Sequence, residues 1–198
     1  MIKKRDLEIA LSRVPPFEEP DPALEQYATP AGVAADVLFE AYSRGDIGGM
    51  RVLDLGCGTG VLSVGAWLLG AAEVSGIDAD EKALAVAERH AAGIGAAVSY
   101  KKSLVSEVSA HADTVVMNPP FGCQSRGADR PFLDKAMESA GSVYSIHKAE
   151  TLGFLREYAE ERGRRVEWDR TYKYRIPHLF AFHREKSKPI DIVAVNIR

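Results

Sequence analysis

The chain has 198 residues, of which 46% are hydrophobic and 27% are charged, a balance that is ordinary for a globular domain with one good core. Its net charge of −3 gives no overall nucleic-acid signature, and its two cysteines, Cys57 and Cys123, are too few for a disulfide framework or a zinc site, so no metal is expected. The apolar stretches are too short to span a bilayer and the charged N-terminus does not resemble a secretory signal, so we expect a cytoplasmic protein without a membrane segment.

The first part of the chain predicts two helices joined by a stiff connection. The first helix is expected over residues 3–13, and the prolines between residues 15 and 22 then favour extended chain. Thr29 is expected to be the N-cap of the second helix, with Pro30 at its first position and an apolar face that continues to about Tyr42. Residues 1–45 are therefore interpreted as an N-terminal helical extension within a single domain, residues 1–198.

From residue 51 onward, short apolar runs alternate with amphipathic stretches. The predicted strands cover residues 51–55, 73–77, 97–100, 114–117 and 142–146, and the predicted helices cover residues 61–69, 81–92, 131–140 and 149–162. This alternation indicates an α/β fold with a mostly parallel sheet that helices cover on both faces. Residues 165–174, 180–183 and 190–197 look like strands with no helix between them, which favours an antiparallel hairpin that closes the sheet.

The charge is distributed unevenly along the chain. Residues 148–198 carry more Lys and Arg than Asp and Glu, whereas residues 1–147 carry more acid than base. An edge that faces RNA would show this asymmetry, because phosphate contacts supply most of the nonspecific affinity. The alternating Glu and Arg of residues 156–165 are equally typical of a solvated helix face. Both interpretations stay open.

A glycine-rich motif, Asp54-Leu55-Gly56-Cys57-Gly58-Thr59-Gly60, follows one predicted strand and opens a helix, which is where an α/β sheet presents a ligand site. Its spacing differs from the dinucleotide fingerprint and from the phosphate-binding P-loop. A carboxylate at the strand end, Asp54, suits a cationic amino-acid group better than a pyrophosphate. Asp78, at the end of the next strand, is placed to accept the two hydroxyls of a ribose. The structural alternatives are a tight turn for the glycines and a helix N-cap for Asp78.

A second motif, Asn118-Pro119-Pro120-Phe121, follows the strand predicted over residues 114–117. The exocyclic amine of a purine is a poor nucleophile, so it must be held with both hydrogens engaged and its electron pair aimed at the electrophile. The Asn118 side-chain oxygen and the Pro119 carbonyl can accept those two hydrogens, and the prolines stiffen the loop. The Phe121 ring offers a surface on which an extruded base can stack. The structural alternative is a proline turn with a buried Phe.

These motifs resemble those of the class I S-adenosylmethionine-dependent N6-adenine methyltransferases, and among them the archaeal and eukaryotic small-subunit ribosomal RNA adenine N6-methyltransferases. The resemblance implies a Rossmann-like fold with a mostly parallel seven-stranded sheet. Gln26-Tyr27 and His147-Lys148 separate this group from generic asparagine-proline methyltransferases. The matching segments are Leu24-Glu25-Gln26-Tyr27 with Thr29, residues 54–63, 76–80 and 117–122, Phe132-Leu133, residues 143–148 and 180–183, and Lys186-Ser187.

The resemblance also implies roles for individual residues. Gln26, Tyr27 and Thr29 would line the methionine end of the cofactor, and residues 118–121 would hold the target adenine. His147 and Lys148 would lie at the mouth of the cleft, where Lys148 meets a phosphate; a satisfied strand-end histidine is the alternative for His147. Ser103 stands where many relatives place an acidic residue beside the adenine ring of the cofactor. The cofactor-lining residues implied are Gln26, Tyr27, Thr29, Asp54, Gly56, Cys57, Gly58, Gly60, Leu62, Asp78, Ala79, Ser103 and Asn118.

The implied partners are small-subunit ribosomal RNA and a small zinc-binding activator subunit of the kind that accompanies the eukaryotic members. Three other functions stay open. An N5-glutamine protein methyltransferase of the release-factor type would hold a planar amide with the same acceptors, although such enzymes usually carry Tyr in place of Phe121 and a separate helical domain. A DNA adenine methyltransferase would usually carry a target-recognition domain. A non-catalytic cofactor-binding subunit would have no physical reason to keep Asp54, Asp78 and the acceptor pair.

Overall fold

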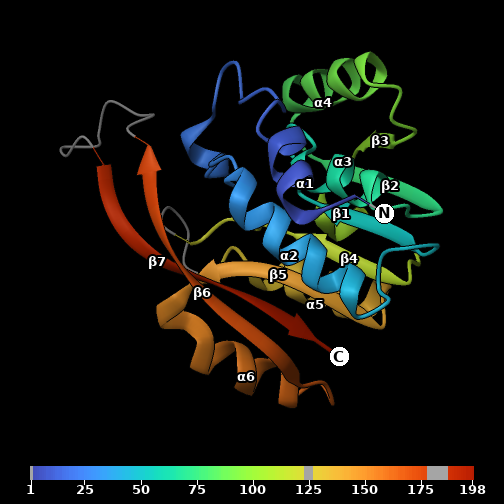
Figure 1. Ribbon diagram of the computed structural model, residues 1–198. Coiled ribbons are helices and arrows are strands. Elements are labelled where there is room, and N and C mark those ends of the chain that lie inside the picture. The colour runs from blue at the N-terminus through green and yellow to red at the C-terminus, as the bar shows by residue number, and fades with distance from the viewer. Residues whose placement is uncertain (1, 123–126, 178–186) are drawn as a thin grey trace.

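The computed structural model describes residues 2–122, 127–177 and 187–198 of the chain. Its centre is a seven-stranded sheet in the order β3-β2-β1-β4-β5-β7-β6 (Figure 1). This sheet confirms the predicted α/β architecture. The strands are β1 (Arg51–Leu55), β2 (Glu73–Asp78), β3 (Ser99–Lys102), β4 (Thr114–Met117), β5 (Ser142–Lys148), β6 (Val166–Pro177) and β7 (Ser187–Ile197).

The first five strands are parallel, and the order of the sheet reverses between β1 and β4. Asp54 of β1 lies opposite Gly76 of β2 on one side and Val116 of β4 on the other. The three strands therefore end together at one edge of the sheet. In open α/β sheets, a ligand binds outside the carboxyl ends of the strands at such a reversal of strand order.

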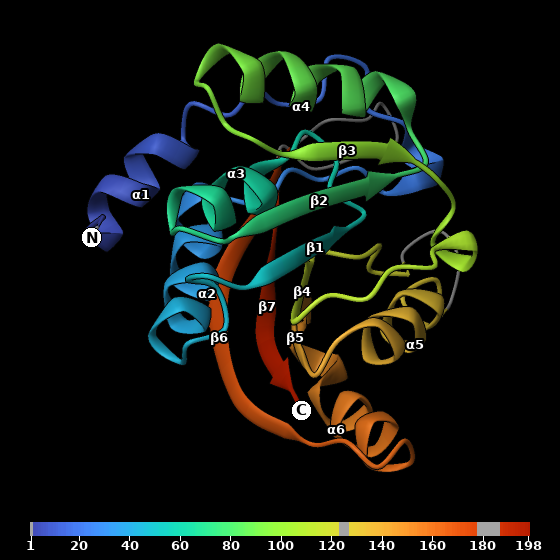
Figure 2. The ribbon, with the colours of Figure 1, turned by 90° about the vertical axis from the view of Figure 1, so that its right-hand side faces the viewer.

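Helices cover the two faces of this sheet. Figure 2 shows α1, α2 and α3 on one face and α5 and α6 on the other, while α4 lies beyond the β3 edge. The core is divided in the same way, since Val52 of β1 packs with the α1–α3 layer and its neighbour Leu53 packs with the α5–α6 layer. The helices are α1 (Lys4–Leu11), α2 (Ala31–Ser43), α3 (Val61–Leu68), α4 (Glu81–Gly93), α5 (Arg130–Ser139) and α6 (Leu152–Glu160), with short 3-10 turns at Pro22–Leu24, Val105–Glu107 and Ala149–Thr151.

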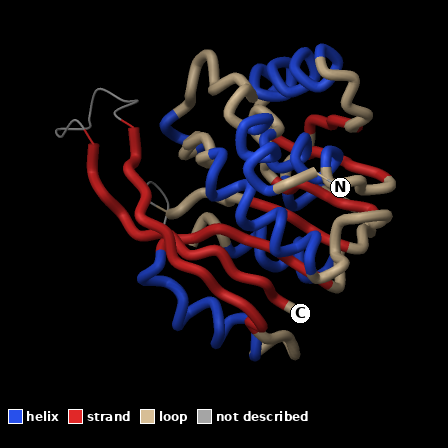
Figure 3. The backbone as a smooth tube through the Cα atoms, in the orientation of Figure 1, coloured by secondary structure: helices blue, strands red, loops and turns tan. Residues whose placement is uncertain are grey.

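The C-terminal hairpin is antiparallel, as predicted. Strand β7 pairs antiparallel with both β5 and β6, and the two long strands of the hairpin run side by side in Figure 3. The additional strand predicted over Phe180 to His183 lies outside the described residues, as do Cys123 and Lys186. Among the residues that are described, no helix has the length and apolar character needed to cross a membrane.

One predicted helix boundary is wrong. Helix α2 begins at Ala31, and its N-cap is Pro30 with φ −59° and ψ 137°, so Thr29 lies one residue before the cap. The extended ψ of Pro30 turns the chain before the helix starts, and the Thr29 hydroxyl accepts a hydrogen bond from the Asn118 side chain instead of capping the helix. Thr29, which was predicted to cap α2, therefore contacts the loop after β4.

Candidate functional site

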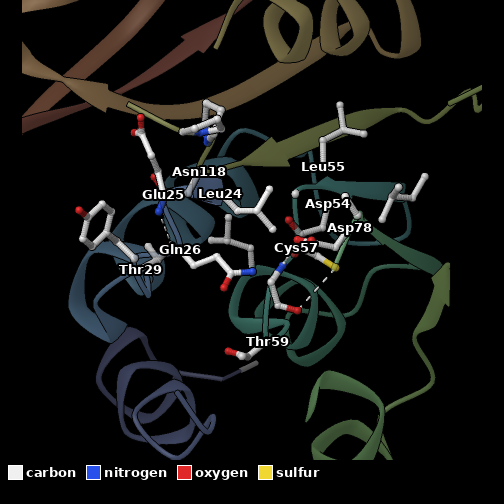
Figure 4. Close-up of a pocket in the computed structure, with 18 of the residues that line it drawn as sticks. Leu24, Glu25, Gln26, Thr29, Asp54, Leu55, Cys57, Thr59, Asp78 and Asn118 are labelled. Carbon is white, nitrogen blue, oxygen red and sulfur yellow. Dashed lines mark hydrogen bonds between the residues drawn. The ribbon is translucent and has the colours of Figure 1, made fainter. Parts of the chain in front are cut away.

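A cavity of about 500 Å³ lies at the edge where β1, β2 and β4 end. Its wall combines the loops after these three strands with the segment that joins α1 to α2. Figure 4 shows Asp54, Asp78 and Cys57 gathered on one side of this pocket, across from Glu25 and Thr29. The predicted residues that line it are Gln26, Tyr27, Thr29, Asp54, Gly56, Cys57, Gly58, Leu62, Asp78, Ala79, Ser103, Asn118, Pro119 and Pro120.

The glycine loop after β1 brings bare main chain to the cavity. Gly56 and Gly58 adopt φ values of 71° and 53°, a left-handed conformation that other residues rarely take. A side chain at Gly58 would also collide with Phe17, because its Cβ would lie 2.7 Å from the Cζ atom of that ring. Gly60 does not line the cavity; it is the N-cap of α3. The loop therefore needs glycine because of its left-handed backbone conformation and because Phe17 leaves no room for a side chain at residue 58.

Asp54 is a buried carboxylate with one open oxygen. Its Oδ2 accepts hydrogen bonds from the Ser63 backbone N–H (2.8 Å) and hydroxyl (2.6 Å), whereas its Oδ1 is buried without a partner among the described residues. Burial raises the pKa of Asp54 to about 7, against the lowering effect of the Ser63 hydrogen bonds. A buried acceptor without a donor is costly, so this oxygen indicates that a ligand with a cationic or N–H group completes the site.

Asp78 organises the same loop from the end of β2. Its Oδ2 accepts from the Gly58 backbone N–H (2.8 Å) and its Oδ1 accepts from that of Asp80 (2.9 Å). Burial raises the pKa of this carboxyl group. Asp80, not Asp78, caps α4 by accepting from the Lys82 backbone N–H, so the N-cap alternative for Asp78 is wrong. Each Asp78 oxygen keeps a further lone pair for a hydroxyl of a ligand.

The Asn118 side chain has a fixed donor end and an open acceptor end. Its Nδ2 donates to the Thr29 hydroxyl (2.9 Å), which holds the side chain in place. Its Oδ1 is buried and has no partner among the described residues. The loop after β4 thus presents the acceptor that an amino group requires.

The segment between α1 and α2 forms part of the cavity wall, and of its lining residues the sequence interpretation named only Gln26, Tyr27 and Thr29. Gln26 fastens the segment, because its Nε2 donates to Asp80 (2.7 Å) and its Oε1 accepts from the Asp21 backbone N–H (2.7 Å). Glu25, just before it, takes the rare positive φ of 50°. No sequence motif predicts the contact between Gln26 and Asp80, because the two residues are far apart in the sequence. The unpredicted lining residues include Leu11 at the end of α1 and, from the segment itself, Val14, Pro15, Pro16 and Phe17.

Phe121 lines a second hollow, of about 420 Å³. The preceding residues 118–120 line the first cavity instead. Consecutive residues of two segments line the two cavities: Pro120 lines the first and Phe121 the second, and at the start of α5 Pro131 lines the first and Arg130 the second. The two cavities therefore lie on either side of the same two segments. The residues around the second hollow are Phe121, Gly122, Gly127, Asp129, Arg130, Lys148, Glu150, Thr151 and Phe154.

The two residues predicted at the mouth of the cleft lie in different surroundings. Lys148 lines the second hollow, and its contact with a phosphate stays a prediction. His147 is only 2% exposed and lines neither cavity, because its ring is held between Asp129 and Ser145. The structure therefore fits the structural alternative for His147, a histidine with both ring nitrogens engaged.

Much of the basic charge of residues 148–198 is paired. Arg156 contacts Asp169 (2.7 Å) and Lys173 contacts Asp191 (2.8 Å), while the Arg164 guanidinium donates to three backbone carbonyls near the end of α5. For these residues, the contacts favour the interpretation of a solvated surface whose basic groups are bound within the chain. Within the described ranges, no group of His, Cys, Asp and Glu is arranged to hold a metal ion. Burial raises the pKa of the Cys57 thiol, so it stays protonated and is not a nucleophile.

Comparison with known proteins gives a consistent result. The family described as methyltransferase small domain matches residues 33–143. The rRNA N(6)-adenosine-methyltransferase METTL5 of Danio rerio is 37% identical over 96% of both chains, and an uncharacterized protein of Methanocaldococcus jannaschii is 35% identical over 100% of this chain and 94% of its own. The crystal structure of a candidate RNA methyltransferase of Pyrococcus horikoshii superimposes with a TM-score of 0.93 at 44% identity, covering 100% of this chain and 98% of the other.

Proposed function

Since this chain belongs to the methyltransferase small domain family, and within it to the family of the rRNA N(6)-adenosine-methyltransferases, we propose that it forms N6-methyladenosine in small-subunit ribosomal RNA. The methyl donor in this proposal is S-adenosylmethionine. The observation that carries the proposal is the buried, open Oδ1 of Asn118, whose amide is fixed by Thr29 at the wall of a large cavity.

The residues of the large cavity fit S-adenosylmethionine. The open Oδ1 of Asp54 suits the ammonium group at the methionine end, the glycine loop lets the ligand approach the main chain, and the Asp78 carboxylate suits the ribose hydroxyls. When bound, the cofactor supplies an electrophilic methyl group on a sulfonium that leaves as a neutral thioether. Residues 1–45 belong to the proposed site as an extension that completes it, with Gln26, Tyr27 and Thr29 in the cavity wall.

In the proposed mechanism, the chain positions the target adenine more than it activates it. Asn118 Oδ1 and the Pro119 carbonyl accept the two hydrogens of the exocyclic amine and so orient its electron pair toward the methyl group. The Phe121 ring supports the extruded base from the second hollow. The proton leaves the nitrogen after transfer, so a general base in contact with N6 is not required.

The proposal includes the location and one protein partner. Ribosomal RNA as substrate implies a cytoplasmic site of action. A small zinc-binding activator subunit, implied by the resemblance to the eukaryotic members, is proposed to raise the activity of this chain. Adding such a subunit to the purified chain tests this part: an unchanged rate would remove the activator from the proposal without affecting the chemistry.

The test of the function is transfer of tritiated methyl from S-adenosylmethionine to total RNA and to protein extract from a strain that lacks this protein. Nucleoside analysis of the labelled fraction follows, and the expected product is N6-methyladenosine in small-subunit ribosomal RNA. Label in a protein would favour the N5-glutamine alternative, and label in DNA would favour the DNA alternative. The absence of label with an activator present would favour a non-catalytic subunit.

A further inference from the structure

A chain of three polar side chains leads from the interior of the molecule to the second hollow. The His147 Nδ1 lies 3.3 Å from Asp129 Oδ2, and its Nε2 lies 2.6 Å from the Ser145 hydroxyl. Because a carboxylate only accepts hydrogen bonds, Nδ1 is the donor in the first contact. Ser145 and His147 are buried at 0% and 2% exposure, whereas the Asp129 side chain is 15% exposed and forms part of the wall of the hollow. The open end of this chain of contacts is therefore the Asp129 carboxylate.

The Asp129 carboxylate is not needed to start α5. Asp129 is the N-cap residue of that helix with φ −76° and ψ −21°, and its side chain makes no capping hydrogen bond. Burial raises the pKa of Asp129, but the contact with His147, the backbone N–H of Asp129 itself and the nearby Arg130 together hold the pKa below its ordinary value. The group therefore stays an anionic acceptor, held by a buried histidine at the wall of a ligand-sized hollow.

The surroundings of Asp129 limit what it can bind. Arg130 and Lys148 line the same hollow and suit the phosphates that flank a nucleotide, and Arg130 also lies 5.3 Å from the centre of the Phe154 ring. An anionic carboxylate repels phosphate, so a substrate group that contacts it must be a hydrogen-bond donor. An adenosine within an RNA strand has two strong donors, the N6 amino group and the ribose 2′-hydroxyl. Under the proposed function, Asn118 and Pro119 take both N6 hydrogens, so the 2′-hydroxyl is the donor that remains.

We infer that Asp129, positioned by His147, accepts a hydrogen bond from the 2′-hydroxyl of the target nucleotide and thereby selects a ribonucleotide over a deoxyribonucleotide. This inference rests on the proposed function, because it requires a target adenosine whose amine reaches Asn118 and Pro119 while its ribose lies at the second hollow. Asp129 touches the substrate, whereas His147 acts through Asp129 as a positioning residue. The 2′-hydroxyl is the group by which a protein distinguishes RNA from DNA at a given site.

The experiment uses the shortest fragment of the methylated RNA that the wild-type chain still modifies, made with either adenosine or 2′-deoxyadenosine at the modified position. The ratio of kcat/KM for the two substrates is expected to be on the order of 10 to 100 for the wild-type chain, the contribution of one charge-assisted hydrogen bond. Asp129→Ala is expected to bring this ratio close to one by lowering the rate on the ribose substrate alone. Asp129→Asn, which keeps the shape of the side chain, is expected to give an intermediate ratio and replaces the alanine variant if that variant does not fold.

Two further variants separate positioning from general damage to the fold. His147→Leu is expected to lower the ratio several-fold, and His147→Asn, whose Nδ2 can reach the place of the imidazole Nδ1, is expected to restore part of it. Glu150→Gln is the matched control, because it removes another carboxylate from the wall of the same hollow and is expected to leave the ratio unchanged.

The outcomes are distinguishable. A wild-type ratio near one, or an Asp129→Ala variant that slows both substrates equally, overturns the role of Asp129 while the proposed function stands. A wild-type chain that methylates no RNA, with or without an activator, overturns the proposed function itself.

Discussion

Two carboxylates at opposite edges of the sheet, the buried Asp54 and the largely buried Asp46, differ in how completely their oxygens are hydrogen-bonded. Asp54 lies at the edge where β1, β2 and β4 end, and its Oδ1 has no partner among the described residues. Asp46 follows α2 at the opposite edge, where β4 and β5 begin. Its carboxylate accepts from the Arg198 guanidinium (2.7 Å to Oδ1), the Tyr144 hydroxyl (2.6 Å) and the Ser142 hydroxyl (3.1 Å).

The contrast separates a polar cluster that holds the fold from one that awaits a ligand. At Asp46, side chains from β5 and from the last residue of the chain fill the acceptor sites of the carboxylate without any ligand. At the other edge, two buried acceptors, Asp54 Oδ1 and Asn118 Oδ1, remain open in the wall of one cavity. Buried polar atoms without partners also occur away from the cavity, for example at Asn196 and Arg198, so it is the shared cavity wall that makes these two acceptors a candidate for ligand binding.

Among the substitutions at the ligand-binding edge, Asn118→Ala should lower the rate of methyl transfer most. We expect methyl transfer to fall by about 10²- to 10³-fold or more, because one of the two acceptors that orient the amine is lost. Affinity for S-adenosylmethionine should stay nearly unchanged, as should the free energy of unfolding. Single-turnover transfer and calorimetry measure the two quantities. Thr29→Val is the matched variant: it keeps Asn118 but removes the hydroxyl that fixes the amide, so a smaller loss of rate is expected. Transfer at the wild-type rate by Asn118→Ala would rule out the acceptor-pair mechanism.

Asp78→Ala should weaken cofactor binding by about 2–4 kcal/mol, through the loss of two charge-assisted hydrogen bonds to ribose hydroxyls. The carboxylate also accepts from the Gly58 and Asp80 backbones, so part of the loss reflects a looser glycine loop. Comparison with Asp78→Asn, which keeps the shape and an acceptor oxygen, separates the two contributions. Unchanged affinity by calorimetry would remove Asp78 from the cofactor site.

Asp46→Ala should damage the opposite edge and leave the ligand site intact. The change leaves the buried Tyr144 hydroxyl and the Ser142 hydroxyl without their acceptor, so we expect a loss of about 2–3 kcal/mol in the free energy of unfolding. Tyr144→Phe removes only one donor and should cost about 1 kcal/mol. Denaturant unfolding gives both values. If Asp46→Ala lowered the affinity for the cofactor without lowering the free energy of unfolding, the two edges of the sheet would not be independent.

The two edges also differ in how far the sequence predicted them. The loops after β1, β2 and β4 were predicted because their motifs follow recognisable strands, and parallel strands bring their ends together. The Asp46 cluster carries no motif: it joins the end of α2, the start of β5 and the last residue, Arg198, which meet only in the folded sheet.

The same reason explains what was missed inside the site. Phe17 closes over Gly58, and Asp129 meets His147 behind the second hollow, yet neither pair is close in sequence. Thr29 was predicted to cap a helix because Ser and Thr favour that position. In the structure its hydroxyl instead accepts a hydrogen bond from the Asn118 side chain. Local patterns therefore predicted the sheet and the strand-end loops, whereas long-range contacts decided which side chains support them.

The most direct comparison of the edges is the pH dependence of stability without cofactor. Burial raises the pKa of Asp54 from 3.8 to about 7 in the folded chain, so the folded state binds this proton more tightly than the unfolded state does. The resulting stability is fully present below about pH 3.8 and is lost as the pH rises through about 7. Between these limits the wild-type chain should lose about 1.4 kcal/mol for each pH unit relative to Asp54→Asn, which cannot titrate at this position.

Urea unfolding of both chains at pH 5 and pH 6 measures this difference. Saturating S-adenosylmethionine should reduce it, because the ammonium group of the ligand stabilises the ionised carboxylate and lowers its pKa. Parallel pH profiles for the two chains would mean that Asp54 is already ionised in the folded chain without a ligand. Its open oxygen would then have a donor before binding, and the difference between the two edges would no longer identify the ligand site.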